Sequence, residues 1–339
     1  MNHDLFSQIT GGNKRINVQT AEMIFFQNKL TNEELSEAAR NYFKINFNNE
    51  IKFFYPGLRF PSISLTNQSC QLKCDHCNMR YLEYMKHISD YHSLVEFAKK
   101  MESAGALGVL ISGGCNVDGA VPLEEFLEDI SRVKNETSLV LNVHTGLIKD
   151  EVVNRLEKTG VDVVSFDVIG DDTVIKKIFH LNKSAGDYSH TFKALKKSMI
   201  KSIVPHICLG LNMGVIKREF EALKIIEEFN PDIIVVIIFT PTIGTPLQNV
   251  RPPSIYSIQR FLSILRLVFP KSELSLGCMR PKKGLKTDVE KAALLSGVNR
   301  FVNPSSKIIK YAGEMGISVK KYYGCCSLPQ DILPSFEIL

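Results

Sequence analysis

The 339-residue sequence lacks a hydrophobic run long enough to cross a membrane, since its longest apolar stretch is residues 233–239 and a spanning helix needs about 20 residues. The first fifteen residues also lack the apolar core of a signal peptide. We therefore expect a cytoplasmic protein with no membrane partner. Cysteines stay reduced in that compartment, so the eight cysteines favour metal binding or catalysis over a disulfide framework.

The sequence also lacks basic runs interleaved with aromatic residues. The net charge is only +5, and the lysine pairs at 196–197, 282–283 and 320–321 are dispersed along the chain. This pattern does not predict nucleic-acid binding. A diffuse positive field is still suited to attracting an acidic protein partner.

A second CxxC pair is missing as well, although zinc knuckles normally carry two. What is present is a single CxxxCxxC motif, formed by Cys70, Cys74 and Cys77, directly after the apolar run 61–66. Three thiolates on one short loop can hold three irons of a [4Fe–4S] cube and leave the fourth iron open to a small molecule. The motif therefore predicts such a cluster, with structural zinc as the alternative.

Short apolar runs rich in β-branched residues alternate with helix-period segments from residue 61 onward, which predicts an α/β fold. We expect strands at 62–66, 107–112, 139–144, 161–167, 203–210, 233–239, 272–277 and 298–302. Eight such strands predict a (β/α)8 TIM-type barrel whose outer ring includes a helix at 93–104. A doubly wound open sheet is the alternative, because closure is inferred only from the strand count.

Three regions follow from this pattern. Residues 1–58 lack strong β runs and contain two helix-like stretches at 20–29 and 31–43. We expect an N-terminal helical extension at 1–58, a barrel at 59–305, and a C-terminal helix and cysteine-containing tail at 306–339 that closes the barrel mouth.

Polar residues alternate with apolar ones on three of the expected strands. The alternation turns Asn142 and His144, Ser165 and Asp167, and His206 and Cys208 toward the barrel interior. Because buried polar groups need partners, these side chains predict a lined cavity. The carboxyl ends of the strands, where barrels build active sites, carry the CxxxCxxC loop, His144, Asp167 and Cys278.

Together, these features resemble the radical S-adenosylmethionine (SAM) superfamily. LISGGC at 110–115 resembles its glycine-rich turn, GLNMGVIKRE at 210–219 its fifth-strand motif, and IIFTPTIGTP at 237–246 its sixth-strand segment. The resemblance implies that SAM binds the open iron of the cluster held by Cys70, Cys74 and Cys77. Residues expected at the cofactor are Ser112, Gly113, Gly114, His144, Asp167, Gly210, Asn212 and Phe239. Tight turns explain the glycines equally well, and Asp167 and Asn212 also suit satisfied core positions.

Residues 60–305 resemble the biotin synthase branch of this superfamily, through HTGLIK at 144–149, TIGTPL at 242–247 and SLGCMRP at 275–281. Biotin synthases use a cysteine near the third strand and an arginine after the seventh for a second cluster, whereas this chain ends its seventh strand in Cys278. We expect a second [4Fe–4S] cluster on Cys115, Cys278, Cys325 and Cys326. Cys208 is the alternate ligand in place of Cys325 or Cys326, whose adjacent side chains diverge. The alternative to a second cluster is that these cysteines are inert buried thiols.

The branch with LGCMRP and a terminal CC pair resembles the archaeal-type two-protein lipoyl synthases. That resemblance implies a radical SAM sulfurtransferase that inserts sulfur from the second cluster into C–H bonds of a protein-bound octanoyl-lysine. The implied partners are an octanoylated lipoyl domain or H-protein-type carrier, a second synthase subunit and an electron donor such as ferredoxin. The alternatives are biotin synthase, a methyltransferase or a cofactor-maturation enzyme, and, from another class, a non-catalytic iron–sulfur carrier.

Overall fold

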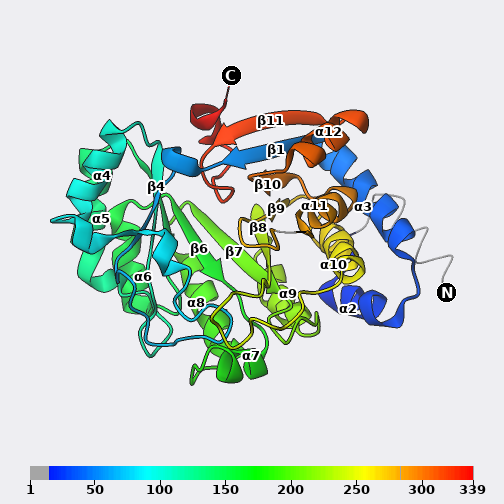
Figure 1. Cartoon of the computed structure of the whole chain (residues 1–339), viewed down its shortest axis with the longest axis horizontal. Coiled ribbons are helices and arrows are strands. Elements are labelled where there is room, and N and C mark those ends of the chain that lie inside the picture. The colour runs from blue at the N-terminus through cyan, green and yellow to red at the C-terminus, as the bar shows by residue number, and fades with distance from the viewer. Residues whose placement is uncertain (1–14, 283, 339) are drawn as a thin grey trace.

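The computed structural model describes residues 15–282 and 284–338, and in them eleven parallel strands form one curled sheet (Figure 1). The strand order is β11-β1-β10-β9-β8-β7-β6-β5-β4-β2-β3. The strands are β1 (Glu50–Tyr55), β2 (Ser62–Ser64), β3 (Lys86–His87), β4 (Gly108–Ser112), β5 (Val140–His144), β6 (Val163–Asp167), β7 (Ser202–Leu209), β8 (Ile233–Ile238), β9 (Glu273–Leu276), β10 (Arg300–Val302) and β11 (Ser318–Tyr323).

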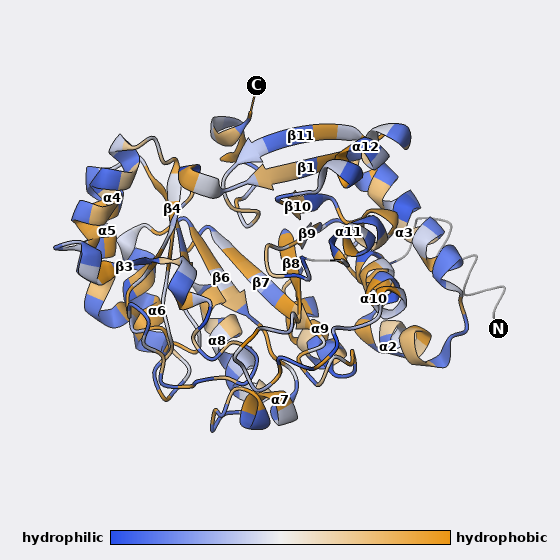
Figure 2. Ribbon diagram, in the orientation of Figure 1, coloured by the Kyte–Doolittle hydropathy of each residue, from blue (hydrophilic) through white to orange (hydrophobic). Residues whose placement is uncertain are grey.

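Helices cover the outer face of the curled sheet and bury their apolar stripes against it (Figures 1 and 2). They are α2 (Val18–Gln27), α3 (Asn32–Phe47), α4 (Leu94–Ser103), α5 (Leu127–Glu136), α6 (Asp150–Leu156), α7 (Asp172–Lys177), α8 (Ala185–Lys197), α9 (Glu219–Glu227), α10 (Ile255–Val268), α11 (Lys286–Leu295) and α12 (Ser306–Glu314). In α4, for example, Leu94, Phe97 and Met101 recur at helical spacing and are all buried.

The predicted α/β barrel-type fold is confirmed, and a strand lies within or across each of the eight expected segments. The barrel is partial, because β3 and β11 are the two edges of the sheet in the described chain rather than a bonded pair. The two N-terminal helices also form, and a capping box between Thr31 and Glu34 begins α3.

Residues 50–55 depart from the expected helical extension. They form β1, which pairs with both β10 and β11 and buries Ile51, Phe53 and Phe54 completely. The polar residues Glu50 and Lys52 interrupt the apolar run, which hid the strand from sequence reasoning. Lys52 is nevertheless buried, because it faces an acidic partner inside the barrel.

The C-terminal tail lies in the amino-terminal half of the barrel interior, not over the mouth as expected. The tail follows β11 and enters the barrel. There Leu328, Leu333 and Phe336 pack in a cluster with Val163 and Ile233, which are the first residues of β6 and β8. This apolar cluster, together with Phe54, Val204 and Tyr322, forms a plug. Apolar side chains in the tail explain the difference, because they are stabilised by burial in the barrel and not at its open rim.

Buried charges hold this plug to the wall. Glu273 accepts hydrogen bonds from Lys52 and from Arg300, and Lys52 Nζ also donates to Gln330 Oε1 of the tail at 2.7 Å. Arg300 Nη1 donates to the carbonyl oxygens of Cys326 at 2.9 Å and Leu328 at 2.7 Å. Burial, and next the charge of Arg300, lower the pKa of Lys52 to about 8. The tail is therefore fixed by directional bonds as well as by apolar contact.

Candidate active site

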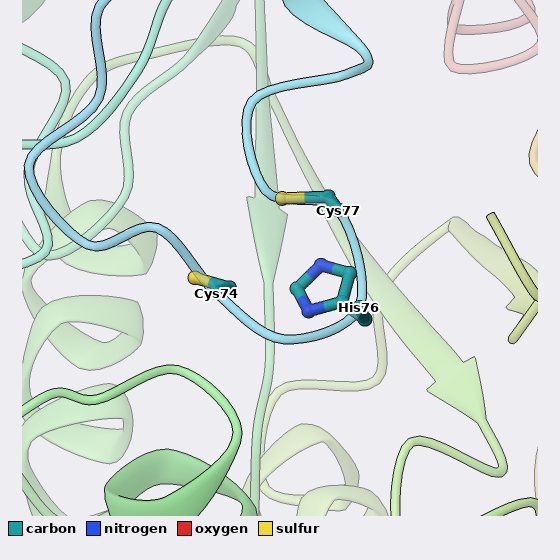
Figure 3. Close-up of side chains that lie close together, drawn as sticks. All are labelled: Cys74, His76 and Cys77. Carbon is teal, nitrogen blue, oxygen red and sulfur yellow. The ribbon is translucent and has the colours of Figure 1, made fainter. Parts of the chain in front are cut away.

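The three cysteines of the CxxxCxxC motif lie on the loop that follows β2, at the carboxyl end of the sheet. The loop turns tightly, since the Asn78 N–H donates to the Cys74 carbonyl at 2.8 Å and Lys73, Asn78 and Met79 adopt positive φ angles of 50°, 41° and 66°. Figure 3 shows Cys74, His76 and Cys77 projecting to the same side of this loop. The local backbone thus brings Cys74 and Cys77 together, while bonds from Gln71 to Cys115 and from Asp75 to Ile178 fix the loop to neighbouring segments.

Cys74 and Cys77 interact directly. A hydrogen bond between the two thiols lowers the pKa of Cys77 to about 4 and, with burial, raises the pKa of Cys74. This bond favours the thiolate form of Cys77, which is the ionisation state that iron requires. A ligand atom of His76 lies within 4.8 Å of both sulfurs, so the alternative donor set for a single metal ion is Cys74, His76 and Cys77.

Cys70 completes the set through contact with the turn after β4. The Cys115 N–H donates to Cys70 Sγ at 3.3 Å, and the Gly114 N–H donates to Thr66 Oγ1 at 2.7 Å. A Cβ on Gly114 would overlap the Ser69 carbonyl and the Cys70 side chain, so only glycine permits this approach. An N–H directed at sulfur is typical of iron–sulfur sites, and the donor set fits a three-thiolate cluster.

The fifth-strand motif forms a braced loop after β7. Gly210 has a φ of 82°, and its N–H donates to Glu219 Oε1 at 2.8 Å, while the Lys217 N–H donates to Glu219 Oε2 at 2.7 Å. Asn212 Nδ2 donates to Asp171 Oδ2 at 3.1 Å. A pocket between the ends of β6 and β7 is lined by Asp171, Cys208, Asn212 and Glu219.

Polar groups face one another in the upper half of the barrel, as the alternation predicted. The rings of His144 and His206 are 5.5 Å apart in an edge-to-face arrangement. Burial, and next the proximity of His206, lower the pKa of His144 to about 4, so this ring is neutral at pH 7. Asp167 is exposed at the end of β6 and interacts electrostatically with His144. Phe239, by contrast, is buried in the hydrophobic core.

A second group of cysteines lies deeper in the barrel. Cys278 follows β9 and is exposed, whereas Cys325 and Cys326 follow β11. Desolvation, and next the charge of Cys325, raise the pKa of Cys278. On a regular backbone, the side chains of an adjacent pair diverge. Here a hydrogen bond between the neighbouring thiols lowers the pKa of Cys325 to about 6 and raises that of Cys326. The chain bends at Gly324, which has a φ of 120°.

The remaining two cysteines lie elsewhere. Burial, and next the charge of Cys70, raise the pKa of Cys115, whose N–H contacts the first cysteine group. Burial, and next the charge of Asp167, raise the pKa of Cys208, which lines the pocket beside β7. The structure thus groups Cys115 with the first motif. From the predicted second set, the exposed Cys278 is close enough to the Cys325–Cys326 pair for their charges to interact.

Sequence reasoning missed several residues that position these groups: Thr66, Asp171, Glu219 and Arg300. Glu219 ends the glycine motif at 210–219, so its place in that motif was a usable signal. Asn142 was expected to face the barrel interior, but its contact with Cys325 was not expected, because that residue lies 183 positions away. Arg300 contacts a tail segment more than 20 residues away and gave no local signal. None of the helices in the described ranges is both long and apolar enough to span a bilayer.

Residues 65–223 match the family model described as the Radical SAM superfamily, so the chain contains a radical SAM domain. Its curated relatives place it more narrowly, in the biotin synthase-like branch. Biotin synthase of Campylobacter hominis is 23% identical over 289 residues, covering 82% of this chain and 86% of the relative. The identification as a radical SAM enzyme agrees with the three-thiolate loop and its glycine-rich neighbour.

Solved structures share the fold. Methylornithine synthase (PylB) superposes with a TM-score of 0.63 at 19% identity, covering 93% of this chain and 97% of the other. The FeFe-hydrogenase maturase HydG from Carboxydothermus hydrogenoformans superposes with a TM-score of 0.69 at 14% identity, covering 96% of this chain and 80% of the other. These similarities support the partial-barrel fold over nearly the whole described chain.

Proposed function

We propose that this radical SAM enzyme inserts sulfur into an unactivated C–H bond, using a second iron–sulfur cluster as the sulfur source. The observation that carries the proposal is the hydrogen bond from Asn142 of the barrel wall to Cys325, whose neighbour Cys326 and the exposed Cys278 interact with it electrostatically. These three thiols lie away from the SAM loop and are not needed by the first cluster. They suit three corners of a second cube.

The bound cofactors would supply the chemistry: the first cluster and SAM a deoxyadenosyl radical, and the second cluster the sulfide. The chain's own contribution is positioning. The loop at Cys70, Cys74 and Cys77 is at the carboxyl end of the sheet, and the second cysteine group lies within the same barrel. A substrate between them would meet the hydrogen acceptor on one side and sulfur on the other, without bulk water.

The preferred substrate is an octanoyl-lysine arm on a lipoyl domain or an H-protein-type carrier. A linear acyl arm can reach into a barrel from its mouth while the carrier stays outside. The net charge of +5 would favour an acidic carrier. A second synthase subunit and a ferredoxin-type reductant are the further partners of this proposal.

Biotin synthase is the second candidate, because the Campylobacter hominis relative carries that name and is similar over 82% of this chain. That activity also inserts sulfur and would also use a second cluster, here on the cysteines at 278, 325 and 326. A methyltransferase, a cofactor-maturation enzyme or a non-catalytic carrier would leave the group at Cys278 without a sulfur-donating role.

Product analysis tests the proposal. Protein reconstituted with iron and ³⁴S-sulfide is incubated with SAM, reductant and either an octanoyl-lysine peptide or dethiobiotin. We expect 5′-deoxyadenosine and ³⁴S-labelled octanoyl peptide, and a Cys278→Ala variant that still forms 5′-deoxyadenosine but no thiolated product. Label in dethiobiotin alone would favour biotin synthase. Deoxyadenosine without sulfur in either product would refute sulfur insertion, and no SAM cleavage would favour the carrier.

A further inference from the structure

Asn142 is a fully buried polar residue of β5 that contacts the second cysteine group. Its side chain has 0% exposure, and its Nδ2 donates to Cys325 Sγ at 3.5 Å across 183 residues of sequence. A buried amide aimed at sulfur is unusual for a core residue, because sulfur is a weak acceptor unless it is ionised or bound to metal.

A second strand fixes the orientation of this amide. Ser165 of β6 is 2% exposed and donates through Oγ to Asn142 Oδ1 at 3.0 Å. Since the oxygen of the amide is occupied by Ser165, its N–H₂ group faces Cys325. A sulfur bound to iron carries no proton and can only accept, so the same orientation is the one that a cluster at Cys325 would require.

The tail is held in register with this pair. Ser165 Oγ lies 3.4 Å from Ser327 Oγ, and the Arg300 guanidinium binds the Cys326 carbonyl at 2.9 Å. Ser327 also hydrogen-bonds to Cys325 through its backbone and its side chain. The sulfur of Cys325 therefore has hydrogen-bond partners both on the barrel wall and on the tail.

Resting on the proposed function, we propose that Asn142, oriented by Ser165, is a positioning residue for the second cluster that donates to its Cys325 sulfur ligand and raises its reduction potential. The reduced form of a cluster carries more negative charge, and hydrogen bonds to its sulfurs stabilise that form. An N–H···S bond in a water-poor interior acts more strongly than one at the surface. Cys70 has its own donor, the Cys115 N–H, so the first cluster should not depend on Asn142.

The test is a spectroscopic redox titration of the full-length protein reconstituted with both clusters. Three variants are compared with the unmodified chain: Asn142→Leu, which keeps a similar volume but has no donor, Ser165→Ala, which frees the amide to rotate, and Ser165→Thr, which keeps the hydroxyl. We expect the second cluster to shift to a more negative potential in Asn142→Leu, less so in Ser165→Ala, and to stay near its original potential in Ser165→Thr. The first cluster, measured in the same samples, should not move.

The outcomes separate this inference from the function it rests on. If the unmodified chain binds only about four irons, no second cluster exists, and the proposed function falls together with this role of Asn142. If about eight irons bind but the second potential is unchanged in Asn142→Leu and Ser165→Ala, Asn142 is only a satisfied core residue and this inference alone is overturned. Should Asn142→Leu fail to fold, Ser165→Ala decides by the same criterion.

Discussion

The two cysteine groups of this chain are built in opposite ways. Cys70, Cys74 and Cys77 lie within eight residues on one loop, and backbone bonds inside that loop bring them together. Cys278, Cys325 and Cys326 come from two distant segments, and they meet only because β11 joins β1 and the tail packs inside the barrel. The first group depends on local turn chemistry, and the second depends on the tertiary fold.

This difference predicts different failures. Damage to the ligands of the first group should abolish radical formation and leave the fold intact, because Cys70 and Cys77 are only partly buried. Damage to the supports of the second group should weaken the fold and the second cluster together, because the same residues hold the plug.

The largest effect is expected from Cys74→Ala. Without one of three ligands the first cluster should be lost, so iron should fall from about eight to about four per chain and 5′-deoxyadenosine formation should disappear. Iron and sulfide assays with chromatography of the nucleoside measure both. Cys115→Ala is the matched control: this residue contributes its backbone N–H to Cys70, so both clusters should remain. Loss of a cluster in Cys115→Ala would show that the Cys115 side chain is itself a ligand, which would contradict the assignment of the two cysteine groups.

Arg300→Leu should be the most destabilising of the changes considered. It leaves Glu273 with one fewer cation and removes donors from the carbonyls of Cys326 and Leu328. Breaking a buried ion pair on one side costs about 3–5 kcal/mol of unfolding free energy, measured by urea titration. Arg132→Ala breaks an exposed pair with Glu136 and should cost under about 1 kcal/mol. Equal losses in both variants would show that the plug is not held by Arg300.

The division between local and distant supports also explains what the sequence could predict. The strands at 233–239 and 203–210 and the CxxxCxxC loop were readable, because apolar runs and ligand spacing are local signals. The plug was not readable: residues 324–338 contain apolar residues and two prolines but no helix or strand period that would show where they pack. Its place inside the barrel depends on Arg300, Lys52 and Asn142, whose partners lie far away in sequence.

The expected role of Cys115 illustrates the same limit. In sequence it follows a strand end, as Cys278 does, so both were assigned to the second group. In the structure the turn after β4 lies against the first cysteine loop, where Gly114 leaves no room for a side chain. A position at a strand end predicts how far along the barrel axis a residue lies. Which residues lie beside it depends on the curvature of the sheet, which the sequence does not show.

Gly114→Ala sharpens the comparison from the side of the first group. The added Cβ would overlap the Ser69 carbonyl and Cys70, so the loop must shift, at a cost of about 1–3 kcal/mol. SAM affinity and 5′-deoxyadenosine yield should fall, whereas the second cluster should be retained. Gly313→Ala, on α12, is the matched control, because its new Cβ meets nothing within 4 Å. This change should raise the free energy of unfolding by about 0.5–1 kcal/mol. A loss of the second cluster alone in Gly114→Ala would contradict this assignment.

The smallest expected effect separates the upper cavity from the plug by its response to acid. Burial and the nearby His206 lower the pKa of His144 to about 4 in the folded chain, against 6.5 for the free side chain. Between these two pH values the unfolded chain binds a proton that the folded chain does not, so stability falls as pH falls through that window.

His144→Gln removes the titrating group, so the cluster-free variant should lose less stability than the unmodified chain when both are acidified from pH 7 to pH 4. Urea denaturation at several pH values measures the difference. His190 is the matched control, because it is exposed beside Asp150 on the surface and its replacement by Gln should leave the acid response nearly unchanged. Parallel stability curves for His144→Gln and the unmodified chain would mean that protonation in the upper cavity is not coupled to folding. The acid sensitivity would then arise from other groups of the chain. A charge on the ring of His144 would be tolerated in the upper cavity, as a charge is at the exposed residue Asp167.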